Sequence, residues 1–189
     1  MRKLILFLFL LPISIFAQKK SWEDILAKEE GLGFERIIAQ KIDSAKSELA
    51  KQNSDLTLEG ISFCIDTFKI EEFARLFSEH RGSTASDIQI LSWQKSQYEE
   101  LSDKVFKKLS KLIKKEDQIF LNTNEKAWQS YKKSQIELIG KLSAHEYIGR
   151  GTINGIINSR YRLGLVVGRT KEIFALYQRI EENVIQEDK

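Results

Sequence analysis

The chain has 189 residues, with 30 lysine and arginine residues, 27 aspartate and glutamate residues and a formal net charge of +3. This near balance argues against a nucleic-acid-binding protein, which needs a basic stripe. One cysteine, Cys64, excludes an internal disulfide, and two histidines, His80 and His145, provide too few ligands for a zinc or other transition-metal site. We expect no metal and no cofactor. We interpret Cys64 as a buried, unreactive thiol; an intermolecular bridge or a reactive thiol are the alternatives.

Residues 1–17 have the layout of a secretory signal peptide. The basic residues Arg2 and Lys3 precede a short apolar run, and Ala17 is a small residue at the expected cleavage point. The apolar run is shorter than the ~20 residues that a membrane span needs. We therefore predict cleavage after Ala17, a periplasmic or secreted mature protein, and no stable membrane insertion after cleavage. An uncleaved anchor is the alternative.

The remaining residues, 18–189, predict one all-α domain, a compact antiparallel bundle of about five helices. The first helix is expected at about 34–51, after the break Gly31-Leu32-Gly33, and the second at about 62–80, before Gly82. The third should open near Ser86, which has capping-box spacing to Gln89, and should run to about residue 114. Its apolar stripe consists of Leu91, Tyr98, Leu101, Val105, Leu109 and Leu112.

A fourth helix is expected at about 116–143. One line of residues at three- and four-residue steps runs along it: Leu121, Asn124, Trp128, Tyr131, Gln135, Leu138 and Leu142. We interpret Trp128 and Tyr131 as core residues, because aromatic residues at helical spacing usually pack inside; a recognition surface is the alternative. Asn124 and Gln135 on the same line would then need hydrogen-bond partners.

A fifth helix is expected at about 152–182, followed by a frayed tail, residues 183–189. The predicted buried face contains Ile157, Tyr161, Leu165, Arg169, Ile173, Leu176 and Ile180. Arg169 interrupts this apolar line, and it must pair with a carboxylate or with carbonyl groups, because an unpaired buried guanidinium costs several kcal/mol. Gly164 and Gly168, four residues apart, would permit another backbone to approach closely.

Three segments carry a family resemblance: NEKAWQSYKKSQ (124–135), EYIGRGTINGIINSRY (146–161) and LGLVVGRTKEI (163–173). They resemble the LprI-type lysozyme-inhibitor family of small exported helical domains, and FCIDTFKIEEFA (63–74) is similar to the start of that domain in divergent members. The resemblance implies a structural motif of Trp128, Tyr131, Gly151 and Arg169. It also implies a division into an N-terminal helical extension, 18–60, and an LprI-like domain, 61–182.

The chain departs from this family at several positions. Family cysteines that could join the last two helices correspond to Ile136 and Tyr161, so both are replaced together by residues that can pack. Lys132-Lys133 stands where the family often has Arg-Asp, and Arg150 interrupts its glycine pair. We therefore describe the chain as a divergent member that lacks the family cysteines.

The resemblance implies that the protein binds and blocks a lysozyme or another peptidoglycan hydrolase. An inhibitor needs a protruding anchor on a rigid scaffold, and the glycine-rich turn offers Tyr147, Arg150 and Thr152 for partner binding. An ordinary helix connection is the alternative interpretation of this turn. A non-enzymatic envelope scaffold or protein-binding module without a hydrolase target is the alternative function.

Enzymatic activity is the third hypothesis for the function. Its only support is a set of carboxylates, Glu71, Glu72, Glu116 and Asp117, of which two could flank a sugar. Nothing in the sequence places a pair across a cleft, and acidic residues on helices usually face solvent. We therefore expect no enzymatic activity and assign no catalytic residue.

Overall fold

The computed structural model of the protein describes residues 26, 28–52, 57–143, 151 and 153–187. This part of the chain forms five helices and no strand: α1 (Lys28–Gln52), α2 (Leu58–Arg81), α3 (Thr84–Leu112), α4 (Gln118–Leu142) and α5 (Ile153–Glu187). The helices pack against one another as an all-α bundle, which confirms the predicted fold class. None of the described helices is long and apolar enough to cross a membrane.

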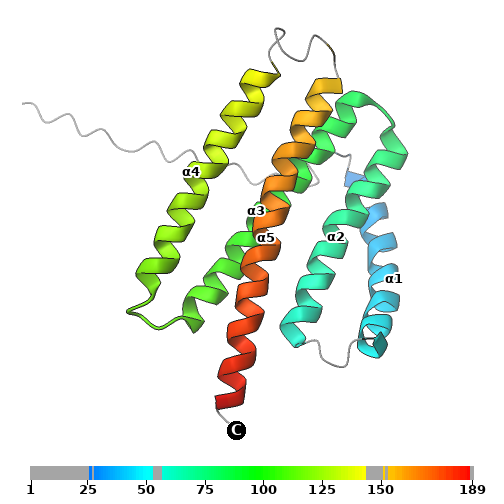
Figure 1. The fold of residues 1–189 in the computed structure, drawn as a ribbon. Helices are drawn as coiled ribbons and strands as arrows, with labels where there is room; N and C mark the ends of the chain where they lie inside the picture. The colour runs from blue at the N-terminus through cyan, green and yellow to red at the C-terminus, as the bar shows by residue number, and fades with distance from the viewer. Residues whose placement is uncertain (1–25, 27, 53–56, 144–150, 152, 188–189) are drawn as a thin grey trace, which may run out of the picture.

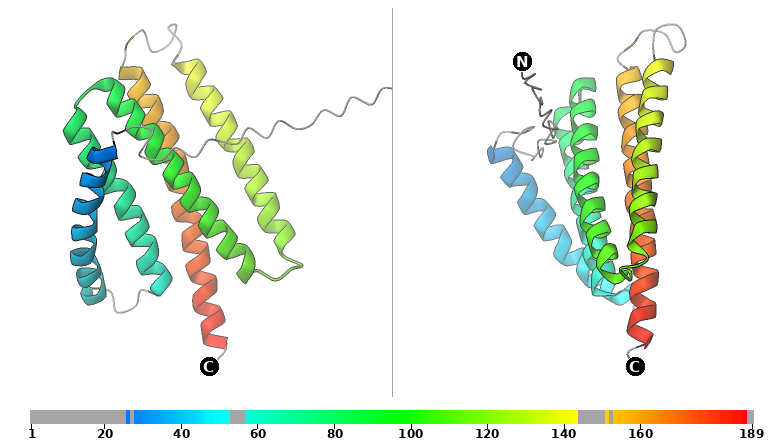
Figure 2. Two further views of the ribbon diagram at one scale, coloured as in Figure 1. Left: turned by 180° about the vertical axis from the view of Figure 1, so that it is seen from behind. Right: turned by 90° about the vertical axis from the view of Figure 1, so that its left-hand side faces the viewer.

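The helices are arranged in three layers (Figure 1, Figure 2). Helices α4 and α5 lie side by side in one layer, α2 and α3 form the next, and α1 lies against α2 on the far side. The most extensive contact joins α3 to α5, whereas α4 meets α5 over a small area. The layer of α4 and α5 therefore has an outward side that no other described helix covers.

The core lies where α2, α3 and α5 meet. The predicted stripe of α3 is buried at Tyr98, Leu101, Val105 and Leu109 and partly buried at its two ends. Phe63 of α2 stacks on Phe174 of α5 with 3.7 Å between ring centroids. Each buried side chain of this kind contributes about 1.5–3 kcal/mol, so these three helices supply most of the hydrophobic stabilisation.

Helix α1 extends this core on the other side of α2. Phe34 meets Phe73 edge to face at 5.7 Å, and Ile38 and Ile42 are buried. The helix begins at Lys28, so the expected break at residues 31–33 was wrong. Glycine costs about 1 kcal/mol inside a helix, and the continuous packing of this face on α2 is large enough to offset that cost.

The other helix ends also differ from the prediction. Helix α2 begins four residues early, capped by Thr57, and ends at Gly82, whose φ of 50° is left-handed as a glycine stop requires. Helix α3 is capped by Ser83, not Ser86, because the Ser83 and Ser86 hydroxyls each accept from the other residue's backbone N–H. Helix α5 continues to Glu187, so the expected frayed tail is helical to that point.

The predicted buried stripes of the last two helices were wrong over much of their length. No described residue of α4 is buried, and Tyr131, Leu138 and Leu142 are exposed. In α5, Ile157 and Tyr161 are exposed while Val166 and Thr170 are buried. The predicted α5 stripe advances in four-residue steps from Ile157 to Ile173. Each such step turns by 400° on a helix with 100° per residue, so the stripe drifts about 40° around α5 at every step. Four such steps separate Ile173, which is buried, from Ile157, which is exposed.

Candidate binding surface

Arg169 joins α5 to the inward side of α4. Its guanidinium donates to Asn124 Oδ1 at 2.6 Å, to Glu125 Oε2 at 3.1 Å and to Glu172 Oε2 at 3.1 Å. It also lies over the Trp128 ring, 5.6 Å from the ring centroid. Arg169 was predicted to pair with a carboxylate or with carbonyl groups, and the structure confirms carboxylate partners. Trp128 is half-buried, and its contact with the cation explains why an aromatic residue occupies this position.

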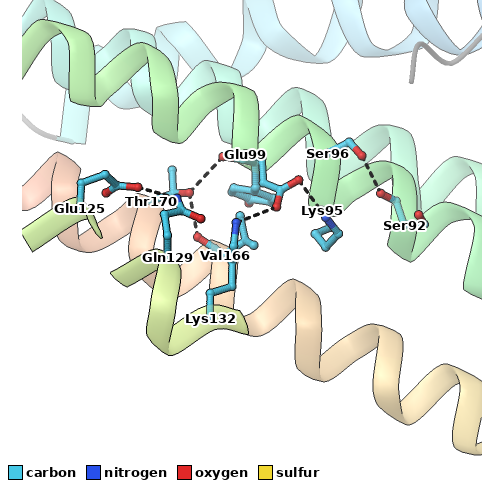
Figure 3. Close-up of polar contacts among 10 residues, drawn as sticks. Ser92, Lys95, Ser96, Glu99, Glu125, Gln129, Lys132, Val166 and Thr170 are labelled. Atoms are coloured by element: carbon cyan, nitrogen blue, oxygen red, sulfur yellow. Dashed lines mark hydrogen bonds and ion pairs between the residues drawn. The ribbon is translucent and has the colours of Figure 1, made fainter. Parts of the chain in front are cut away.

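A second polar contact joins α4 to α3. Lys132 Nζ donates to Glu99 at 3.3 Å, and Lys95 donates to the other oxygen of Glu99 at 2.8 Å (Figure 3). Thr170 of α5 is fully buried beside them, and it donates to the backbone carbonyl groups of Val166 and Tyr98. Charged and polar groups therefore provide much of the contact between α4 and the bundle, beside the partly buried Leu121 that packs against the core.

Polar bonds also fix the antiparallel register of α4 against α5. Asn124 meets Arg169, Gln135 accepts from the Tyr161 hydroxyl, and Ser143 donates to Asn158 at 2.7 Å. The predicted need of both amides for partners is confirmed, although Tyr131 is not one of them. This register places the C-terminal half of α4 beside the N-terminal half of α5. Residues whose numbers sum to about 295 therefore lie opposite one another.

Exposed apolar residues line both helices on the outward side of this pair, and we name this surface the outer seam. They are 38% to 72% exposed, and they comprise Phe120, Tyr131, Leu138 and Leu142 of α4 with Ile153, Ile157, Tyr161 and Leu176 of α5. The register places Leu138 opposite Ile157 and Leu142 opposite Ile153. The seam runs along α4 for roughly 33 Å, taking a rise of 1.5 Å per residue.

Glycines interrupt the seam near its centre. Gly164 and Gly168 are exposed, and a Cβ atom added to either would meet no atom within 4 Å. The register places Gly164 opposite Tyr131. The seam therefore carries bulky residues towards both ends and a shallow stretch of α5 backbone between them, where another chain could approach closely.

Basic residues border the outer seam. Lys141 follows Leu138 on α4 by three residues, and Arg160 and Lys171 follow Ile157 and Gly168 on α5 by three, so each lies next to the seam on its helix; we name these three the basic rim. None of the three has an ion pair within the described residues, whereas Lys133, on another face of α4, lies 4.0 Å from Glu137. The surrounding segment 118–172 holds nine basic and four acidic residues, so positive charge that is nearly balanced over the whole chain is concentrated here.

The predicted partner-binding residues Tyr147, Arg150 and Thr152 lie outside the described residues, so their prediction stays untested. Gly151 is described and exposed. The structure does bring Trp128 and Arg169 together, whereas Tyr131, predicted as core, belongs to the outer seam. The correction follows from α4 lying at the edge of the bundle, where only one side of the helix meets neighbours.

The remaining candidate sites are a groove, the predicted carboxylates and possible metal ligands. A groove of about 350 Å³ lies between α1, α2 and α3, lined by Ile38, Ile42, Ile70, Phe73 and Trp93 among others. Of the four predicted carboxylates, Glu71 accepts from Tyr98 and Glu72 accepts from Arg75 and Lys41, whereas Glu116 and Asp117 are exposed. The described residues contain no cluster of three or more potential metal ligands.

The sequence matches no family model, and searches among curated proteins and solved structures also find no match.

Proposed function

We propose that the mature chain is an exported, non-enzymatic binding module that docks a partner protein on the outer seam. The observation that carries this proposal is the line of exposed apolar residues on both α4 and α5. Scattered exposed apolar residues are ordinary, but a contiguous apolar surface on a monomer is typical of an interaction site. Tyrosine and large aliphatic side chains are suitable anchors for the centre of such an interface.

A lysozyme-type or other peptidoglycan hydrolase is the first candidate partner. The family resemblance supports it, and so does the position of the seam in the chain. Leu142 and Ile153 form the end of the seam, and the connection between them carries Tyr147, Arg150 and Thr152. In this proposal the turn fills the acidic cleft of the enzyme, where Arg150 pairs with a carboxylate, and the seam supplies the apolar contact area.

A second candidate is a binding module of the cell envelope without a hydrolase target. The basic rim favours it, because lysozymes are typically basic outside the cleft and would be repelled by the three cations of the rim. An acidic partner protein would instead be attracted. Both candidates use the outer seam, and they differ in the identity and charge of the protein that occupies it.

The test uses the purified mature protein, whose intact mass should start at Gln18 if export and cleavage proceed as expected. Lysis of a peptidoglycan suspension by several lysozymes is followed with and without an excess of this protein, and direct binding of the same enzymes is measured. Inhibition should weaken at least tenfold in Leu138→Asp and in Arg150→Ala. Leu58→Asp is the matched control, because Leu58 is an exposed leucine outside the seam.

The possible results separate the two candidates. Slowed lysis that depends on Leu138 and Arg150 supports the hydrolase inhibitor. No binding to any tested enzyme discards inhibition of those enzymes and leaves the envelope module. Inhibition that persists at full strength in Leu138→Asp would show that the outer seam is not the docking surface.

A further inference from the structure

We infer that the occupant of the outer seam is an amphipathic helix with acidic flanks, supplied by a different protein; this inference rests on the proposed function. The shape of the surface gives the first argument. Helices α4 and α5 lie side by side, and the exposed apolar residues on both offer a third helix a surface to pack against. A third helix would cover the outward side of α4 and α5, which no other described helix covers (Figure 2).

The distribution of bulky and small residues gives the second argument. Leu138, Leu142, Ile153 and Ile157 form an apolar platform at one end, and the exposed backbone at Gly164 follows it along α5. A helix that crosses at the glycines can bring its own backbone close to α5, which increases the number of van der Waals contacts. A globular partner with a flat face would leave this central stretch poorly filled.

The basic rim determines the charge of the occupant. Lys141, Arg160 and Lys171 have no ion pair within the part of the chain that the structure describes. Carboxylates placed on the flanks of a docked helix would meet these cations on both borders. Each pair at such a solvent-exposed border contributes little affinity but steers association and selects the partner, so binding should weaken in salt.

The same rim argues against a second copy of this chain as the occupant. In a two-fold dimer through the outer seam, the border of one protomer meets a border of the other. Both borders are basic, so every arrangement of that kind opposes like charges. Among the described residues, Glu172 follows Gly168 by four residues and so lies beside the seam, but this carboxylate already pairs with Arg169.

The test measures binding of a designed probe to the purified mature protein by fluorescence anisotropy at low and physiological salt. The probe is a 25-residue helical peptide with a leucine and alanine face and glutamates on both flanks. A matched peptide carries lysines in place of the glutamates. We expect the acidic peptide to bind at least tenfold more tightly than the basic one, and this preference should shrink severalfold as salt increases.

Protein variants locate the probe on the molecule. Ile157→Asp and Gly164→Trp should each weaken binding of the acidic peptide at least tenfold, the first by removing an apolar contact and the second by filling the shallow centre. Arg160→Glu combined with Lys141→Glu should remove or reverse the preference for the acidic peptide. Leu58→Asp should leave binding unchanged. Circular dichroism of every variant checks that it remains folded.

Three results would overturn the inference. Equal binding of the acidic and basic peptides, or no binding of either, excludes an acidic helix as the occupant. Sedimentation of the wild type as a dimer that Ile157→Asp separates assigns the seam to a second copy. Binding to anionic phospholipid vesicles that is lost in Ile157→Asp assigns it to a bilayer. If Leu138→Asp still abolishes binding to a hydrolase, the proposed function stands although the helix does not.

Discussion

Trp128 and Arg169 show how one pair of residues connects packing with charge. The arginine is almost fully buried, yet all its carboxylate partners retain contact with solvent, and the tryptophan covers it on one side. A buried guanidinium without such partners would cost several kcal/mol. The tryptophan therefore acts at the edge of the bundle as a cover for a cation, and its contribution to stability depends on Arg169.

A double-mutant cycle measures this dependence. Trp128→Ala should lower the free energy of unfolding by about 1–2 kcal/mol, less than the ~3–5 kcal/mol typical of a fully buried aromatic residue, because Trp128 is only half-buried. Trp93→Ala, in the core, should reach that larger range. In urea denaturation, Trp128→Ala and Arg169→Met should show a coupling energy of about 0.5–1 kcal/mol. Strictly additive losses would mean that the two side chains act independently.

Glu72 is a buried carboxylate whose ionisation is linked to stability. Arg75 donates to its oxygens at 2.7 and 2.8 Å, and Lys41 of α1 also donates to it. The Arg75 bonds, against the opposing effect of burial and with help from Lys41, lower the Glu72 pKa from 4.5 to about 2. A lowered pKa in the folded state stabilises the protein above pH 4.5, and that contribution is lost as the pH falls from about 4.5 to 2.

Glu72→Gln should therefore be less stable than the wild type at pH 7, by about 1–3 kcal/mol, as expected for lost hydrogen bonds to charged groups. The difference between the two proteins should shrink as the pH is lowered from 4.5 towards 2. Thermal unfolding at a series of pH values checks this, with Glu116→Gln at an exposed position as the control. A difference that stays constant down to pH 2 would contradict the assigned linkage.

At the scale of elements, α4 differs from its neighbours in having polar contacts on its inward side. The sequence could predict a helix over about 116–143, close to the observed 118–142, since the spacing and composition agree. It could not predict which side of that helix is buried, because Leu121, Trp128 and Ile139 alternate with Glu125 and Lys132 on the inward side. Glu125 and Lys132 can be assigned to the inward side only when the structure shows their partners, Arg169 and Glu99, opposite them.

Helix α4 should therefore open locally more readily than α3. No described side chain of α4 is buried, whereas α3 buries eight residues, and local opening costs least where few apolar contacts are lost. In native-state hydrogen exchange followed by mass spectrometry, peptides from 118–142 should exchange at least tenfold faster than peptides from 90–109. Raised salt should increase the difference by screening the Lys132–Glu99 pair. Equal protection of both helices would show that α4 unfolds only with the whole molecule.

At the scale of the whole molecule, the fold class and the helix count followed from periodicity, but the candidate site did not. Ile157 and Tyr161 have the spacing of a buried stripe, and a single sequence cannot distinguish a stripe that faces the core from one that faces an absent partner. One feature of the sequence does indicate the outer seam: in residues 153–177, apolar residues occupy a wide arc around the helix. Lines through Ile153 and Ile157 and through Ile156 and Val166 together cover more of α5 than one neighbour can bury.

Helix α1 packs as part of the same folded unit as α2 and α3. The resemblance placed residues 18–60 outside the family-like domain, yet Leu26, Ile38 and Ile42 belong to the same buried cluster as Phe73 and Trp93. Lys41 adds an ion pair to the buried Glu72. If α1 is part of the folding unit, removing it exposes one side of α2 and leaves that carboxylate with one cation fewer.

Deleting residues 18–56 from the mature chain should therefore lower the free energy of unfolding by at least about 3 kcal/mol, since three buried side chains each contribute about 1.5–3 kcal/mol. Thermal and urea denaturation measure the loss, and increased binding of a hydrophobic dye should report the uncovered side of α2. Lys41→Ala separates the ion pair from the packing and should account for a minor share. A truncated protein as stable as the full mature chain would mean that α1 is an accessory extension and that residues 57–187 fold independently.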